Sequence, residues 1–476
     1  MEKTTGVDGS DEPIGSAAIV STPPGRSGAD ESGTGEPYSG ERAMNRRNVL
    51  RYGGALATVG LAGCVGDQRS EPGVPIDDSD DDSDNDSEER ADDARDDTTG
   101  ADGEGEPGTE DPDGRTCELG GRISEDTVLG NGCREYLVTR TVSVDSGATL
   151  TVEPGVTVTF ASGTGIRVRR DGTLSAVGTE TDPITFTGER ERRGYWSAIS
   201  FEETGGPNEL QHVIVEYGGA PIQRRTDASV YVEGTSSHRS RVSIVDSTLR
   251  ESEGYAISVD QWSVLEEFSG NTLTANELGA AHVYSTSADS LDSSTTYAGN
   301  DRDVVLVDGV AIGPDASVRW PALDVDYLVA DRTLITGGHL TIEPGATLVF
   351  RHAASIDVRR DTSGVSGALT AVGTAEEPIR FTGEEESPGY WRGIGFSNAE
   401  SEDNRFEHVT VEYAGSDSFY GGAAGGPPAI ITVTAVEYSS TLSLSDVTLS
   451  HSGGHCIYVD ESSSVTEVRV SKEACE

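Results

Sequence analysis

An internal duplication constrains this 476-residue chain more than any other feature of its sequence. The motifs LTVEPG and LTIEPG begin at Leu150 and Leu340, 190 residues apart, and further motifs recur around them in the same order. The matched segments are 135–160 with 326–350, 172–188 with 367–383, 194–201 with 389–396, 210–219 with 406–415, and 242–260 with 442–460. The chain therefore contains two copies of about 140–150 residues joined by about 50 more, as expected for a repeat architecture.

Within each copy the apolar residues alternate with polar ones, which is the period of a β-strand. Residues 150–160 show the pattern, with a turn at Pro154-Gly155. The side chains predicted to face the core are Leu150, Val152, Val156, Val158 and Phe160. Those predicted to face solvent are Thr151, Glu153, Thr157 and Thr159. The sequence thus predicts short strands separated by turn residues.

A shorter period is nested inside the duplication. Similar strands begin at Leu150 and Leu174, and another follows near residue 199, so the spacing is about 24 residues. One coil of a solenoid has this length. A β-sandwich or barrel is the competing architecture, but it needs no such nested period.

The recurring motifs LT[VI]EPG, AVGT, PI.FTG, GYW and VEY resemble those of the right-handed parallel β-helix, the pectin-lyase-like fold. The resemblance covers about residues 120–476 and includes asparagine-containing turns in 271–276 and 296–309. It implies an all-β solenoid of two tandem copies. We expect copy one with its connecting coils at 117–325 and copy two at 326–476.

Residues 44–64 resemble a twin-arginine lipoprotein signal. Arg46 and Arg47 precede a stretch of small and apolar residues that is too short to span a bilayer, and Cys64 follows it. The resemblance implies export of the folded protein, lipidation of Cys64, and anchoring at the outer face of the cell membrane. A buried amphipathic helix would leave the arginine pair and the cysteine unexplained. We expect residues 1–43 to be a mis-assigned or disordered extension, with translation starting at Met44.

Residues 65–116 form an acidic segment of low complexity, which we expect to be a disordered tether. A calcium loop is the alternative, but residues 78–86 lack the glycine and the terminal glutamate of an EF-hand. The whole chain has 83 acidic and 35 basic residues and a formal charge of −48. Such a charge disfavours nucleic-acid binding, which needs clustered Lys and Arg. Because the acid excess continues beyond Cys117, the composition resembles that of proteins from halophilic archaea.

Four cysteines remain after Cys64, and they lie in two close pairs at the ends of the predicted solenoid. The pairs are Cys117 with Cys133 and Cys456 with Cys475. Three disulfide connectivities are possible, and pairing of neighbours would staple both ends. Zinc binding is disfavoured because neither pair has the CxxC spacing.

The motifs point to no catalytic constellation. Their acidic and histidine residues recur in both copies, and one active site needs no second copy. We therefore expect no catalytic residue, no metal site and no cofactor, and a role in binding or adhesion to a polysaccharide or surface protein. A polysaccharide lyase or glycoside hydrolase acting on an acidic polysaccharide is the alternative. Trp196 and Trp391, in the repeated GYW motif, are candidates for stacking on a sugar, or else for burial.

Overall fold

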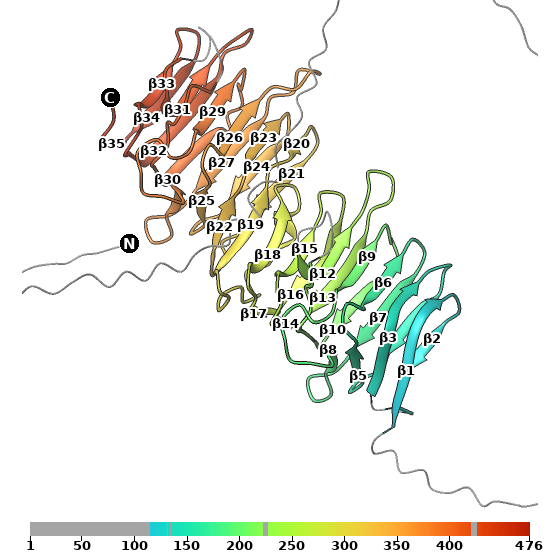
Figure 1. Cartoon of the computed structure of the whole chain (residues 1–476). Coiled ribbons are helices and arrows are strands. Elements are labelled where there is room, and N and C mark those ends of the chain that lie inside the picture. The colour runs from blue at the N-terminus through green and yellow to red at the C-terminus, as the bar shows by residue number, and fades with distance from the viewer. Residues whose placement is uncertain (1–114, 131, 134, 222–226, 420–425) are drawn as a thin grey trace, which may run out of the picture. The chain divides into compact units, whose positions relative to one another are not determined.

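The computed structural model describes residues 115–476 except 131, 134, 222–226 and 420–425. The predicted signal at 44–64, with Arg46, Arg47 and Cys64, lies outside the described residues. So do residues 1–43 and nearly all of the tether. In the described part every named element is a β-strand except one short 3-10 turn, η1 (Ala288–Ser290). Strands stack in sequence order from β1 (Thr116–Ile123) to β35 (Ser471–Glu473), coil upon coil (Figure 1).

Three ladders of parallel strands build the coils of the first copy. Ladder one contains β2 (Thr127–Leu129), β4 (Thr149–Val152), β7 (Thr173–Val177), β10 (Asn208–Gln211), β13 (Arg241–Val245) and β16 (Val264–Ser269). Ladder two contains β5 (Thr157–Phe160), β8 (Ile184–Gly188), β11 (Val213–Glu216), β14 (Thr248–Arg250) and β17 (Thr272–Thr274). Ladder three contains β6 (Ile166–Arg169), β9 (Ile199–Glu202), β12 (Ala228–Glu233), β15 (Tyr255–Val259) and β18 (Gly279–Tyr284). Strand β1 pairs with the long strand β3 (Glu135–Val144). The first part of β3 then pairs with β5 in ladder two, and its second part pairs with β6 in ladder three.

The second copy repeats the three ladders. Ladder one continues through β21 (Ser317–Trp320), β24 (His339–Ile342), β27 (Ala368–Val372), the first parts of β30 (Arg405–Glu412) and β32 (Thr441–Ser450), and β34 (Ser464–Val468). Ladder two contains β22 (Asp326–Val329), β25 (Thr347–Phe350), β28 (Ile379–Gly383), the second parts of β30 and β32, and β35. Ladder three contains β20 (Ala311–Ile312), β23 (Arg332–Thr336), β26 (Ser355–Arg359), β29 (Gly393–Ser397), β31 (Ala429–Thr434) and β33 (His455–Val459).

Where the two copies meet, a strand of one ladder pairs with a strand of a different ladder in the next copy. Strand β18 of ladder three pairs with β19 (Val304–Asp308), and β19 pairs with β22, which is ladder two of the second copy. A new ladder three begins at β20. In ladder one the turn η1, rather than a strand, lies between β16 and β21 and contacts both. The junction is therefore a local irregularity in otherwise regular coils.

Inward side chains form one continuous core through the coils. The five residues predicted to face inward in 150–160 are all buried, from Leu150 to Phe160. The predicted all-β class and parallel β-helix are confirmed. Thr159 lies on the outer face of ladder two as predicted, but it has little exposure, and its hydroxyl donates a 2.7 Å hydrogen bond to the carboxylate of Glu135 on the neighbouring coil.

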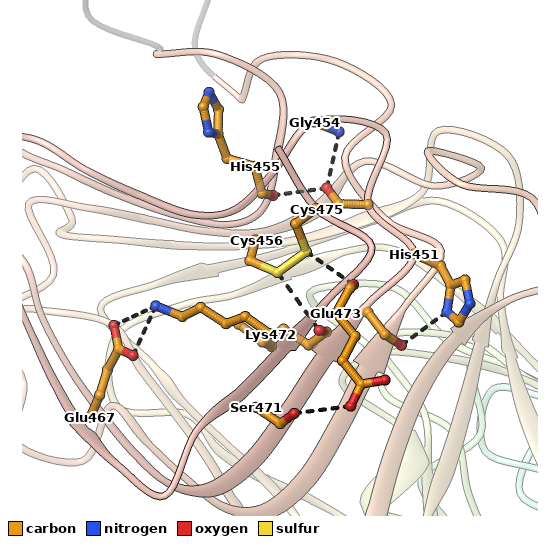
Figure 2. The surroundings of a disulfide bond; sticks show 12 residues. His451, Gly454, His455, Cys456, Glu467, Ser471, Lys472, Glu473 and Cys475 are labelled. Carbon is orange, nitrogen blue, oxygen red and sulfur yellow. Dashed lines mark hydrogen bonds and ion pairs between the residues drawn. A yellow bond between two sulfur atoms is a disulfide. The ribbon is translucent and has the colours of Figure 1, made fainter.

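Disulfides join the neighbouring cysteines at each end. Cys117 bonds to Cys133 and Cys456 bonds to Cys475. Of the three possible connectivities, the one present is therefore the pairing of sequence neighbours. Figure 2 shows the second bond, which ties the segment after β35 to β33. Strands β34 and β35 are largely exposed, so this bond restrains the end of the chain where little apolar surface is buried.

Candidate ligand-binding groove

The two tryptophans of the GYW motifs are core residues. Trp196 and Trp391 are fully buried, and each stacks on a phenylalanine, Phe160 at 4.1 Å and Phe350 at 4.0 Å between ring centroids. A sugar platform needs an exposed ring face, so the possible ligand-stacking role of Trp196 and Trp391 is ruled out and the burial alternative holds. Large aromatic area is buried here because both ring faces find apolar partners.

Hydrogen bonds explain why this arrangement recurs. The indole N–H of Trp196 donates to the backbone carbonyl of Glu216 at 2.8 Å, and Trp391 does the same with Glu412. The carboxylates of these glutamates point outward and pair with arginines of ladder two, Glu216 with Arg250 and Glu412 with Arg380. These contacts of the repeated motif residues therefore stabilise the coil in both copies.

The repeated histidines serve the corners of the coil. His212 and His408 both adopt a positive φ, 48° and 50°, where the chain turns from ladder one to ladder two. A positive φ at this place in both copies fits the turn between ladder one and ladder two.

Trp262 differs from the other three tryptophans. Trp196, Trp320 and Trp391 are fully buried, whereas Trp262 is 37 % exposed. It lies in the turn between β15 and β16, at the edge where ladder three passes into ladder one. The matching turn of the second copy has Ser462 at this position. An aromatic side chain that the duplication does not repeat, and that the core does not need, is a candidate for binding.

Asp260 holds the turn that presents Trp262. One carboxylate oxygen accepts hydrogen bonds from the Trp262 backbone N–H at 2.9 Å and the Ser263 hydroxyl at 2.6 Å. The other accepts from the backbone N–H of Gly234, one coil earlier, at 2.9 Å. Bonds to a carboxylate are among the stronger hydrogen bonds, so the turn is rigid before any ligand arrives.

A groove of about 450 Å³ opens beside Trp262. It is lined by the Trp262 turn, by η1 and its neighbours, and by residues from β20 to β21, where the copies meet. The lining residues are Arg239, Gln261, Trp262, Ser263, Val264, Thr286, Asp289, Ser290, Ala311, Asp315, Ala316, Ser317 and Val318. Because η1 replaces a strand of ladder one, the coil surface is irregular at this point.

The groove mixes one aromatic ring with hydroxyl, amide and charged groups. Desolvation by neighbouring atoms raises the pKa of Asp289, although the residue as a whole is exposed, and Arg319 partly offsets this effect. A buried hydroxyl, Thr286 Oγ1, has no hydrogen-bond partner in the described structure. With Arg239 the only basic residue among the described lining residues, the surface suits an uncharged ligand rich in hydroxyl groups.

A serine, a histidine and an aspartate also lie in line on the outer side of ladder three. Ser258 Oγ is 2.8 Å from His282 Nδ1, and His282 Nε2 is 3.0 Å from Asp308 Oδ2. A carboxylate only accepts, so Nε2 carries the hydrogen and Nδ1 accepts from the serine. Ser258 and His282 are buried, and the three hydrogen-bonded side chains join β15, β18 and β19 on successive coils.

A second hollow of about 570 Å³ lies over ladder two and is lined by glutamates and threonines. Three of its four glutamates accept hydrogen bonds: Glu135 from Thr116 and Thr159, Glu189 from Tyr195, and Glu216 from Thr187 and Arg250. Among the described residues no group of three or more His, Cys, Asp or Glu could hold a metal ion. In the same part of the chain no helix is long and apolar enough to cross a membrane.

Comparing the two copies shows that Trp262 and Trp320 each occur in one copy only. Because Trp320 is fully buried in the core, the repeat pattern alone does not identify Trp262 as the exposed tryptophan. The groove itself was beyond sequence reasoning, because it depends on how η1 and residues 311–318 pack at the junction.

Comparison with known proteins agrees with the coil geometry. A family model described as a pectate-lyase-like beta helix domain matches residues 121–228. A segment of 76 residues, 16 % of the chain, is 38 % identical to Protein bark beetle of Drosophila melanogaster, but it covers 2 % of that protein's length. No solved structure matches the chain. Residues 121–228 are thus similar to the pectate-lyase-like β-helix domains, and the parallel ladders extend that architecture to β35.

Proposed function

We propose that the protein is a non-catalytic glycan-binding protein of the cell surface, and that the groove beside Trp262 is its binding site. The observation that carries the proposal is the partly exposed Trp262, which lines a polar groove from a turn whose backbone is held by Asp260. Aromatic rings with a free face bind the apolar face of sugar rings, while nearby hydroxyl and amide groups bind the sugar hydroxyls.

The ligand class that fits best is an uncharged polysaccharide. A formal charge of −48 repels polyanions over long range at low salt. The groove itself offers two aspartates and one arginine, so it provides no excess of positive charge to offset this repulsion. A neutral, hydroxyl-rich chain avoids both penalties.

The proposal places the protein outside the cell, in a halophilic organism, attached to membrane lipid. The twin arginines Arg46 and Arg47 and the lipidation cysteine Cys64 support export and anchoring, and the two disulfides fit an oxidising compartment. Replacing Cys64 with serine should release the protein from the membrane fraction into the medium. Retention of the C64S variant in washed membranes would contradict the anchor.

The binding site is tested by replacing Trp262 with the serine that the second copy has at the same turn. Binding of the chain to a glycan array in high salt should be lost in Trp262→Ser, while Ser462→Ala serves as the matched control and binds as before. Acrylamide should quench one tryptophan population in the wild type and none in Trp262→Ser, because the other three indoles are buried. Unchanged glycan binding in Trp262→Ser would overturn the proposal, as would release of reducing sugars by the purified chain.

A further inference from the structure

A second exposed aromatic side chain lies on the same edge of the solenoid, in the other copy. Tyr438 is 47 % exposed and sits in the turn between β31 and β32, where ladder three again passes into ladder one. Among the described residues, Trp262 and Tyr438 are the two large aromatic side chains with substantial exposure. Both belong to the turns that precede a strand of ladder one.

The Tyr438 ring is in contact with an arginine side chain. The guanidinium of Arg360 lies over one ring face, 4.4 Å from the centroid, and Arg360 is itself paired with Glu400. A cation–π contact of this kind restrains the ring, which remains 47 % exposed as a residue.

The backbone of the same turn is also fixed. The side-chain oxygen of Asn398 accepts hydrogen bonds from the three successive N–H groups of residues 436, 437 and 438, at 2.8, 3.1 and 3.2 Å. The Ser439 hydroxyl donates to Glu400 at 3.1 Å. A ring on a mobile loop loses entropy on binding, whereas this one is already ordered.

The two rings are separated along the axis by a definite number of coils. The turns that precede η1, β21, β24, β27, β30 and β32 follow the Trp262 turn one by one. Six coils at the spacing of neighbouring strands correspond to about 29 Å. Because both turns precede strands of ladder one, a ligand that follows this edge along the axis passes both turns.

We propose that Tyr438, backed by Arg360, is a second stacking site, and that one neutral polysaccharide chain is bound along this edge at Trp262 and Tyr438 together. The inference rests on the proposed glycan-binding function and adds its ligand class: a linear polymer, rather than a single sugar or a short end group. Two linked contacts raise the affinity well beyond that of either contact, through the effective concentration of the second.

The test measures binding of neutral β-glucan, mannan, xylan and dextran, each as the polymer and as oligosaccharides of graded length, to the full chain in high salt. For the sugar that binds, affinity should rise by about 100-fold over the lengths that reach about 29 Å. Tyr438→Ala should remove that rise without weakening the shortest binding oligosaccharide. Tyr438→Phe should retain it, as should Val436→Ser, a more exposed neighbour that lacks a ring.

The outcomes separate the two proposals. One outcome supports the groove and overturns the second site. In that outcome Trp262→Ser abolishes binding, the affinity does not depend on the length of the oligosaccharide, and Tyr438→Ala binds polymer like the wild type. If none of the four polymers binds, both are wrong. An affinity that rises with length but does not respond to Tyr438→Ala also overturns the second site, because the polymer then follows another part of the surface.

Discussion

At the scale of single residues, the duplication shows which side chains both copies share and which only one copy has. Trp196 and Trp391 occupy the same place in both copies and stack on Phe160 and Phe350 at nearly the same distance. Trp262 is replaced by Ser462 in the second copy, yet Asp260 and Asp460 hold both turns in the same way. The second copy thus shows that the turn forms without the indole, so Trp262→Ser should leave the fold intact.

Buried asparagines join successive coils, and Asn276 gives the clearest prediction. Its side chain accepts from the Ser252 N–H at 3.0 Å and donates to the carbonyl of Leu249 and to Asn300. Asn276→Ala leaves buried backbone groups without partners and should cost about 2–4 kcal/mol of unfolding free energy. Urea unfolding measures the loss, and the exposed neighbour Glu277→Ala serves as the control. A loss below about 1 kcal/mol would contradict the stated role of Asn276.

The sequence predicted core positions better than it predicted the site. Alternation identified Leu150 to Phe160 correctly, since burial in a strand follows a period of two. It placed Thr159 on the correct, outer face but not its low exposure, which accompanies a hydrogen bond to a carboxylate of the next coil. It could not tell exposed from buried tryptophan, since the partners of Trp196 come from strands far away in the sequence.

At the scale of elements, the coil period predicted the ladders, but the junction was not predictable. The segment 285–303 has no counterpart in the second copy, so no repeat indicates that η1 takes the place of a strand. Nor does a period of about 24 residues show that β18 continues through β19 into ladder two of the next copy. These pairings depend on the packing of the irregular coil between them.

The terminal coil should depend on its disulfide more than the rest of the solenoid does. Cys456 and Cys475 are 19 residues apart, and closing such a loop contributes about 3 kcal/mol in the chain-entropy model. In a Cys456→Ala/Cys475→Ser variant, amide exchange of β34 and β35 should accelerate by 10-fold or more, while the central strands keep their protection. The matched variant Cys117→Ser/Cys133→Ala should loosen β1 instead. Equal loss of protection throughout the solenoid would contradict this local role.

At the scale of the whole molecule, charge makes salt a condition of stability. The formal charge of −48 destabilises the compact state through self-repulsion, and screening at molar salt shortens the Debye length to about 3 Å. The melting temperature should therefore rise by several degrees between about 0.01 and 1 M KCl, with most of the gain at the lower concentrations. A melting temperature that is unchanged or falls over this range would contradict the inference of adaptation to salt.

The central claim is that a neutral polysaccharide binds at the edge that carries Trp262. Hydrogen exchange of the full chain with and without the polymer selected by the binding assays tests it most directly. The account predicts slowed exchange in residues 260–264, 286–290 and 311–318, with an unchanged outer face of ladder two. Protection confined to ladder two, around Glu135 and Glu216, would contradict it.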